Sequence, residues 1–420
     1  MISAPTGRPN MLVIAYACEP GKGGEQGVGW NWALQLSQFA DVTVITRANN
    51  REAIEGALSQ LSGPVPKFEF YDPPAWALRL KRGPLGLYLF YFIWQWGCRE
   101  IARRLDRDQS FTHVQQLTFG NIWLPVAVRG LRGQFIWGPI GGGEGVPIHL
   151  LGEVSAKARY LQRLRLLLIA TLRFNPIVAP VLKRADLILI RTEDTMRILP
   201  SSARSKAISM QESGISAETL DRLNPPEERS TGSAPTILFT GRLVGFKNVE
   251  MLLHAAARAR ENGVDFRLRI VGDGPERSRL IALTKQLQLE DRTTFVGTVP
   301  YAQHLEELRN AHIFAFPSLR EAGPWSPMEA MCAALPVICV DTSGMSMITS
   351  EECAVRVAPT SREAIISGFA QAINDLCSSA ELRTQLGQRA RARMRDKFIW
   401  ERKGDEIAER VLRLAPRSCD

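Results

Sequence analysis

The sequence predicts an α/β protein built from two doubly wound domains, each with a parallel sheet covered by helices. Three observations carry this prediction. At 420 residues, the chain is too long for one ordinary core. Near its start, a buried apolar strand runs into a glycine-rich loop and then a helix. From residue 236 onward, short apolar runs alternate with helix-length segments, which is the pattern of a parallel sheet.

The first domain opens with an apolar run at 11–17, which we expect to be a buried strand. The glycine loop 21–29 follows it, and a helix is expected to begin near Trp30. Further strands are expected at 41–46, 111–119, 134–137 and 185–190. A second glycine loop, 138–145, follows the strand at 134–137, so the two loops should lie together at the carboxyl edge of one sheet.

The glycine loops do not match the standard nucleotide-binding fingerprints. The dinucleotide fingerprint needs glycines at relative positions one, three and six, and the two nearest matches fail at the sixth: Gly21, Gly23 and Gln26, and Gly272, Gly274 and Arg277. No Gly-Lys-Ser/Thr ends either loop, so the P-loop pattern fails as well. Either the loops let a ligand approach the backbone closely, or they are only tight turns.

An aromatic stretch at 85–96 interrupts the alternation in the first domain. Cations bracket it on both sides: Arg79, Lys81, Arg82, Arg99, Arg103 and Arg104. The stretch is too short to span a membrane, and it fits either a helix lying in a membrane interface or an ordinary core helix.

A basic stretch at 155–184 contains no acidic residue. Its cations alternate with apolar side chains, which favours contact with an anionic membrane surface or an acidic acceptor. The cations we expect to face the membrane are Arg159, Arg163 and Arg165.

The composition indicates a folded protein with 45% apolar and 23% charged residues. Seven scattered cysteines without a CxxC pair favour reduced thiols and disfavour a structural zinc site. We see no secretory signal, so we expect a cytoplasmic protein or one peripheral on the inner face of the cell membrane. The net charge of +9 favours a phosphate-bearing ligand or an anionic surface, and the chain lacks a recognised nucleic-acid-binding motif.

A polar, proline-rich link at 220–235 indicates the domain boundary. Beyond it we expect the strands and helices of the second domain at 236–240, 249–261, 267–271, 275–289, 294–296, 302–310, 313–317 and 337–340. The end of the chain, from residue 361 on, is expected to be mostly helical. The predicted domains are residues 1–218 and 219–396, with a last helix at 397–420.

Charged residues follow two strands of the second domain. Arg242 and Lys247 come directly after one strand, where they could hold a diphosphate. Glu321 lies in the loop after another strand, and Glu329 lies on the helix that follows. Because the carboxyl ends of parallel strands meet at one edge, both pairs could reach one nucleotide diphosphate.

The order of these motifs resembles that of the retaining glycosyltransferases of family 4, in particular a branch that builds bacterial exopolysaccharide or O-antigen. The resemblance rests on a glycine loop, Gly241-Arg-x4-Lys247, the segments 271–276 and 317–318, and Glu321-x7-Glu329. It implies the GT-B fold, in which two Rossmann-like domains face a cleft and the C-terminal helix packs back on the N-terminal domain. It also implies a nucleotide-diphospho-sugar donor, a saccharide or polyprenyl-linked acceptor, and no required metal or cofactor.

The resemblance implies a role for each matching residue. Arg242 and Lys247 would bind the diphosphate and stabilise the leaving group, Glu321 would contact the donor sugar, and Glu329 would bind the ribose hydroxyls. The remaining donor-side positions are Gly23, Gly24, Gly241, Gly272, Gly323, Pro324, Trp325 and Ser326. The acceptor-side positions are Glu25, Gln115, Gly141 and Gly142.

Three departures from the family pattern bear on specificity. Gln115 stands where many relatives have a histidine, and His113, two residues earlier on the same strand face, is the candidate to replace it in catalysis. Pro324 and Pro327 remove backbone donors from the donor loop. Ala334 stands where a glycine is usual.

The protein is therefore predicted to be a membrane-associated hexosyltransferase. It would transfer a sugar, with retention, in bacterial surface polysaccharide synthesis. Two alternatives stay open at this point. One is a sugar-nucleotide epimerase of the same fold, and the other is a non-catalytic nucleotide-sugar-binding partner subunit.

Overall fold

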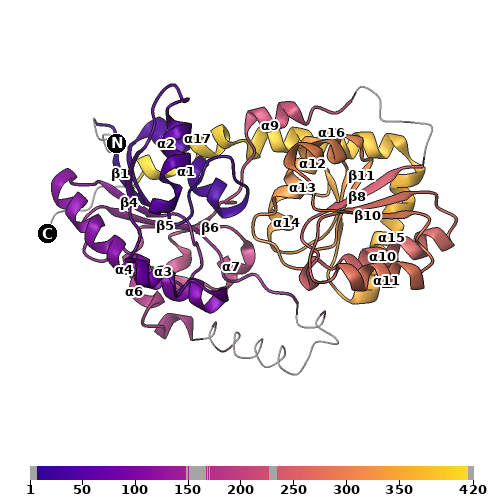
Figure 1. The fold of residues 1–420 in the computed structure, drawn as a ribbon, viewed down its shortest axis with the longest axis horizontal. Helices are drawn as coiled ribbons and strands as arrows, with labels where there is room; N and C mark the ends of the chain where they lie inside the picture. The colour runs from indigo at the N-terminus through magenta and orange to yellow at the C-terminus, as the bar shows by residue number, and fades with distance from the viewer. Residues whose placement is uncertain are drawn as a thin grey trace. The chain divides into compact units, whose positions relative to one another are not determined.

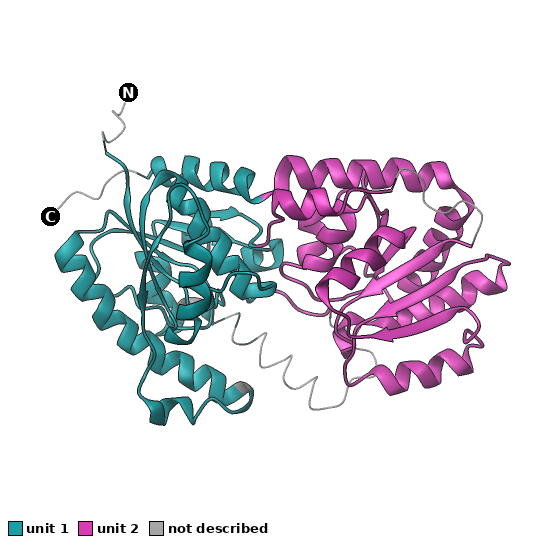
Figure 2. Cartoon of the chain, turned by 45° about the horizontal axis from the view of Figure 1, so that its top comes forward, with its two compact units in different colours: residues 1–143, 164–212, 400–420 teal, residues 144–163, 213–399 magenta. Residues whose placement is uncertain are grey.

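A computed structural model of the chain describes residues 7–147, 150, 167, 169, 171–226 and 234–414 (Figure 1). The chain divides into two compact units (Figure 2). The first contains residues 1–143, 164–212 and 400–420, and the second contains residues 144–163 and 213–399. The boundaries expected from the sequence were 218/219 and 396/397, and those of the units are 212/213 and 399/400.

The first unit is built on a parallel seven-stranded sheet in the order β3-β2-β1-β4-β5-β6-β7. Its strands are β1 (Asn10–Ile14), β2 (Asp41–Thr46), β3 (Lys67–Phe70), β4 (His113–Gln116), β5 (Gln134–Ile140), β6 (Leu187–Ile190) and β7 (Ala207–Ser209). Five of these strands confirm the sequence prediction. The other two, β3 and β7, are short, and their half-buried residues give no continuous apolar run.

Helices cover both faces of this sheet. They are α1 (Gly24–Phe39), α2 (Arg51–Leu58), α3 (Ala75–Leu78), α4 (Gly83–Gln109), α6 (Val178–Arg184), α7 (Glu193–Ile198), α8 (Ser201–Arg204) and α17 (Trp400–Leu412), with short turns η1 (Ala48–Asn50) and η3 (Leu172–Phe174). Leu12 and Ile14 of β1 share one core with α4 and α6. Because strand side chains alternate, Met11 and Val13 face the other side, where α1 and α17 lie (Figure 1).

The helix α1 begins at Gly24, so the predicted start near Trp30 is wrong. The glycines at 24, 27 and 29 hide this start because glycine is a poor helix former. Gly29 has a packing role, since a Cβ there would lie 2.0 Å from the main-chain oxygen of Ala17. The helix can therefore pack against the segment after β1 only with glycine at this position.

The C-terminal helix α17 packs against α1 in the first unit, as the predicted fold requires. Lys403 of α17 is buried there, donates to the main-chain oxygen of Gln211 and lies over the Trp32 ring. Burial lowers the pKa of Lys403 to about 8. None of the helices in the described part of the chain combines the length and hydropathy needed to cross a membrane.

The second unit holds a parallel six-stranded sheet in the order β10-β9-β8-β11-β12-β13. Its strands are β8 (Thr236–Thr240), β9 (Arg267–Val271), β10 (Thr293–Gly297), β11 (Ile313–Phe316), β12 (Val337–Val340) and β13 (Ala354–Val357). Its helices are α9 (Ala217–Arg222), α10 (Val249–Glu261), α11 (Arg277–Gln286), α12 (Tyr301–Asn310), α13 (Trp325–Cys332), α14 (Ser343–Ile348), α15 (Arg362–Ser378) and α16 (Ala380–Arg393), with turns η4 (Gly245–Lys247) and η5 (Met394–Phe398). The five strands expected in this unit are confirmed, and the sixth, β13, was not expected from the sequence. One continuous core joins all six strands.

Candidate active site

The second sheet reverses its strand order between β8 and β11. From β8 the chain moves outward through β9 to β10, and from β11 it moves the other way through β12 to β13. In an open parallel sheet, the loops at such a switch point diverge and leave a crevice at the carboxyl ends of the strands. The loop after β8 carries Arg242 and Lys247, and the loop after β11 carries Glu321, so the structure brings these predicted residues to one place.

Lys247 and Glu321 join the two loops directly. The Lys247 Nζ atom lies 2.5 Å from Oε1 of Glu321, and both side chains are largely buried. The Ser318 hydroxyl donates to the same carboxylate oxygen at 2.6 Å. The ammonium also lies 4.6 Å from the centroid of the Phe316 ring, which favours a cation at this position. The site is therefore organised around one ion pair.

Arg242 precedes Lys247 in the same loop and is exposed, and its side chain has no ion-pair partner among the described residues. The loop that carries it is held by close backbone packing. A Cβ on Gly272 would lie 2.0 Å from the Gly241 oxygen, and one on Gly274 would lie 2.4 Å from the Leu243 oxygen. These glycines let the loops after β8 and β9 touch, which fixes the base from which the Arg242 side chain extends.

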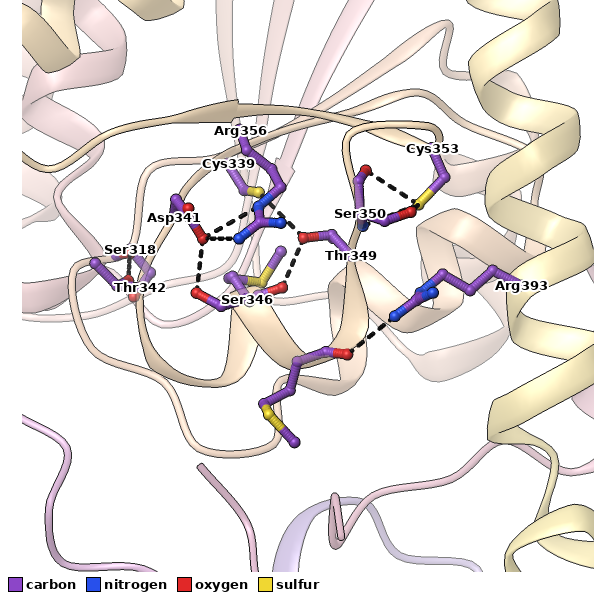
Figure 3. A network of polar contacts seen from close by, with 12 residues as sticks. Ser318, Cys339, Asp341, Thr342, Ser346, Thr349, Ser350, Cys353, Arg356 and Arg393 are labelled. Carbon is purple, nitrogen blue, oxygen red and sulfur yellow. Dashed lines mark hydrogen bonds and ion pairs between the residues drawn. The ribbon is translucent and has the colours of Figure 1, made fainter. Parts of the chain in front are cut away.

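The Glu321 loop is supported from the neighbouring β12–α14 connection. The Gly344 amide donates to the Glu321 main-chain oxygen at 2.8 Å. Behind it lies a polar network in which Arg356 pairs with Asp341, and the Ser346 hydroxyl donates to Asp341 at 2.7 Å (Figure 3). The network fixes the start of α14 and, through it, the main chain at Glu321.

Glu329 is buried on α13, and both of its carboxylate oxygens have partners. The Tyr301 hydroxyl donates to Oε1 at 2.9 Å, and the His304 Nε2 atom lies 2.9 Å from Oε2. Burial and the nearby Glu329 carboxylate raise the pKa of Tyr301, so its hydroxyl stays a donor. Tyr301 and His304 belong to α12, and the sequence reasoning missed both because two polar residues three positions apart on a helix are common.

The donor loop itself runs into the start of α13. The Ser213 hydroxyl donates to the Gly323 oxygen at 3.1 Å, and the Ser326 hydroxyl donates to the Thr240 oxygen at 3.2 Å. Pro324 caps α13, with Trp325 as its first residue. The loop is thus tied to the end of β8 by Ser326, next to the Arg242 segment.

The first sheet has its own switch point, between β1 and β4. Glu25 follows β1, and its Oε1 atom accepts from the Gly120 amide at 3.3 Å in the segment after β4. Arg191, directly after β6, donates to the Gly120 oxygen at 3.0 Å and pairs with Glu212 at 2.6 Å. Burial raises the pKa of Glu25, the Glu212 carboxylate adds to this rise, and Arg191 opposes it.

A cavity of about 180 Å³ opens beside Glu25. Its lining combines two charged residues with apolar and aromatic ones: Glu25, Leu87, Tyr88, Phe119, Gly120, Asn121, Leu124 and Arg191. Glu25 was an expected acceptor-side residue, whereas Arg191 was not recognised. A single cation after a buried strand is too frequent to identify a site from sequence alone.

The predicted glycines of the first unit lie around the same sheet edge. Gly23 is the cap of α1, and Gly24 has a φ of +65°; both are exposed in open space. The Gly141 amide donates to the Gly120 oxygen at 2.7 Å. Gly142 has a φ of +122°, and a Cβ there would lie 2.8 Å from the Ile122 side chain.

His113 and Gln115 lie inside the sheet. His113 is the first residue of β4, at the amino end of the strand, and its Nδ1 atom lies 2.9 Å from the Thr112 hydroxyl. Burial lowers the pKa of His113. Gln115 is fully buried and donates to the Gly138 oxygen at 2.8 Å. The structure does not bring His113 to the carboxyl edge where Glu25 and the glycine loops lie.

The three membrane-facing arginines expected from the sequence, Arg159, Arg163 and Arg165, lie outside the described residues. The aromatic stretch forms part of α4. The interpretation of this stretch as a core helix holds for one face of α4. Phe90, Tyr91 and Trp94 are buried in the first core.

Two parallel α/β units with loops meeting at a switch point in each define the GT-B class of fold. HepE of Anabaena, solved in complex with UDP, has this arrangement, with a TM-score of 0.61 at 14% sequence identity. The match covers 96% of this chain and 99% of HepE. The predicted fold class is therefore confirmed.

Residues 222–393, all in the second unit, match the family described as glycosyl transferases group 1. WcaL of Escherichia coli K12, which carries the name of a colanic acid biosynthesis glycosyltransferase, is 28% identical over 41% of this chain and 43% of its own length. The 2-deoxystreptamine glucosyltransferase of Streptomyces kanamyceticus is 26% identical over 59% of this chain and 63% of its own length. The chain thus spans less than two thirds of these relatives.

Proposed function

We propose that the protein is a retaining hexosyltransferase that moves a sugar from a nucleotide-diphospho-sugar to a saccharide or lipid-linked acceptor in bacterial surface polysaccharide synthesis. One observation carries the proposal. At the switch point of the second sheet, within the segment that matches the family, Lys247 and Glu321 are paired, and Arg242 of the same loop as Lys247 is exposed. The names of WcaL and of the UDP complex of HepE support this class of reaction and donor.

The donor diphosphate would bind to the two cations. Arg242 offers a guanidinium fork, and the Lys247 ammonium would turn from Glu321 toward the phosphate. Glu321, released from the pair, would accept hydrogen bonds from the donor sugar. The Glu329 carboxylate would accept hydrogen bonds from the ribose hydroxyls. The amides after Gly323 would face the sugar or the distal phosphate.

Transfer would proceed on one face of the sugar. The bond between the anomeric carbon and the phosphate oxygen breaks, and the acceptor oxygen attacks from the same side. The acceptor hydroxyl proton passes to the departing phosphate oxygen. Arg242 and Lys247 stabilise the charge that grows on that phosphate, which is the largest contribution the protein can make here.

The acceptor would occupy the cavity beside Glu25 in the first unit. Glu25 and Arg191 offer hydrogen bonds to hydroxyl groups, and the apolar lining suits a sugar ring face or the start of a lipid. An anionic membrane surface is the expected second partner, which would place the protein on the inner face of the cell membrane.

The test is release of nucleoside diphosphate when the protein is incubated with individual nucleotide-sugars and membrane extract. We expect release with one donor and only when extract is present. Release without any acceptor indicates the epimerase alternative. Nucleotide affinity without turnover indicates the non-catalytic partner subunit. Failure of every donor, together with flat thermal shifts, would overturn the proposal.

A further inference from the structure

Helix α4 carries a second apolar face that the first core does not cover. Its buried face points to the sheet through Phe90, Tyr91, Trp94, Cys98 and Ala102. On the same helix, four large apolar side chains are exposed: Leu85, Leu89, Phe92 and Trp96. Their spacings of four, three and four residues place them on one stripe of the helix. Leu85 and Trp96, at its ends, are 73% and 76% exposed.

Helix α3, which precedes α4 in the chain, contacts α4 (Figure 1). Trp76 and Leu78 are exposed on α3, and Leu80 is exposed in the turn that follows it. We call these seven residues the α3–α4 apolar surface: Trp76, Leu78, Leu80, Leu85, Leu89, Phe92 and Trp96. An exposed group of this size on a folded unit marks a contact with something else, because single exposed apolar residues need no explanation but contiguous ones do.

The charge around the surface identifies its occupant. Arg79 and Arg82 are exposed within it, and no acidic residue occurs from residue 73 to residue 99. Lys81 is partly committed elsewhere, since its ammonium lies 5.4 Å from the Phe90 ring centroid. A second copy of the same surface would bring these cations together, which costs free energy. An anionic lipid surface complements both the apolar stripe and its cations.

We propose that the α3–α4 apolar surface is a membrane-binding face that lies in the interface of an anionic bilayer. Its leucines and aromatic rings enter the boundary of the acyl region, and Arg79 and Arg82 extend to the headgroup phosphates. The proposal deepens the membrane partner of the proposed function and rests on it in that respect. The same helix supplies Leu87 and Tyr88 to the acceptor cavity, so a lipid-linked acceptor held in that bilayer has its head close to Glu25.

Flotation of the full chain with vesicles of phosphatidylglycerol and phosphatidylcholine tests the proposal. We expect the wild type to float, and the double variant Leu85→Ser/Trp96→Ser to partition about 100-fold more weakly, because two large side chains no longer leave water. Arg79→Ala/Arg82→Ala should bind roughly 30-fold more weakly at low salt, and the difference should shrink as salt rises.

Matched controls lie on α17, on the opposite face of the sheet. Leu412 is 47% exposed and Arg402 is an exposed cation, so Leu412→Ser and Arg402→Ala should float as the wild type does. Nucleotide affinity, measured on every variant with soluble UDP or GDP, should stay unchanged. A wild type that binds no nucleotide would count against the proposed function. If that protein still floats with the vesicles, the membrane-binding face is supported independently.

Two outcomes overturn the membrane face. One is a wild type that does not float with anionic vesicles. The other is a Leu85→Ser/Trp96→Ser variant that floats unchanged, with its helical signal and melting temperature intact. Sedimentation tests the alternative that a second copy of the chain covers the surface. A wild type that is a dimer and does not bind vesicles, together with a double variant that is a monomer, would assign the surface to a second copy.

Discussion

The two sheets share a topology, but different chemistry joins the loops at their switch points. In the second unit, the Lys247–Glu321 ion pair joins the loops after β8 and β11, beside a backbone bond from the Leu319 amide to the Phe246 oxygen. In the first unit, no ion pair joins the described residues of the segments after β1 and β4; the Glu25 carboxyl accepts from the Gly120 amide, and the Thr118 hydroxyl accepts from the Ala17 amide. An ion pair can exchange its carboxylate for a phosphate, whereas a buried carboxyl that holds a main-chain amide cannot.

The difference separates the roles of the two units. A crevice with one exposed arginine and a lysine that can change partners suits a diphosphate. A cavity that combines one acid, one arginine and aromatic walls suits hydroxyl groups and an apolar ring face. If this difference holds, the Lys247–Glu321 pair acts in catalysis, and the contact between Glu25 and the Gly120 amide acts in stability.

The largest effect is expected for Lys247→Ala. Removing a cation that stabilises the leaving diphosphate should lower kcat/KM by about 10²–10³-fold, as measured by steady-state nucleoside diphosphate release. Lys285→Ala, at an exposed position in the last turn of α11, is the control and should keep wild-type rates. A Lys247→Ala enzyme within threefold of the wild type would remove this lysine from catalysis and leave its ion pair a structural feature.

Arg191→Ala should be costly to stability. It leaves the mostly buried Glu212 carboxylate and the Gly120 oxygen without their guanidinium, so the free energy of unfolding should fall by about 2–3 kcal/mol, less than for a fully buried pair. Denaturant unfolding measures it. The surface pair Arg197–Asp194 is the comparison, and Arg197→Ala should cost about 0–1 kcal/mol. Equal costs for the two variants would show that Arg191 does not hold the Gly120 segment.

How much of this the sequence predicts differs between the units. In the second, β8, β11 and β12 have apolar runs, and β12 begins and ends where expected. Arg242, Lys247, Glu321 and Glu329 carry a recognisable spacing, so the sequence identifies them. Their pairing does not follow from it, because an apolar strand and a loop position do not say which cation a carboxylate will contact.

In the first unit, the sequence identifies Glu25 by its place in a glycine loop but not Arg191. It also misses the division of α4 into two apolar faces, since a stretch that is apolar all round shows no helical period. His113 was predicted to replace the histidine expected at position 115 because side chains two residues apart lie on the same face of a strand. This alternation predicts the face but not the position along the strand. The structure places it at the amino end of β4, one strand length from the loops.

A smaller effect is expected where Glu329 is held. Tyr301→Phe removes one hydrogen bond to a carboxylate that should bind the ribose, so the nucleotide Kd should rise about fivefold, corresponding to about 1 kcal/mol, with kcat nearly unchanged. Isothermal titration and the separate KM and kcat values measure this. His304→Gln should act in the same direction, and His254→Gln, on α10, is its control. If kcat falls and Kd does not move, Tyr301 acts on the sugar and not on the ribose-binding acid.

The smallest effect concerns the pH dependence of Glu25. Because its folded-state pKa lies above the ordinary value of 4.5, the protonated carboxyl is the form that folding favours. Stability from this group is fully present below pH 4.5 and is lost as the pH rises through the folded-state pKa. Glu25→Gln keeps an acceptor for the Gly120 amide and cannot ionise. The variant should therefore be more stable than the wild type at neutral pH, and as stable as the wild type below pH 4.5, where the Glu25 carboxyl is protonated. Unfolding free energies measured across this range should converge on the acidic side; parallel curves would mean that burial does not disfavour the Glu25 carboxylate and that the cavity is open to water.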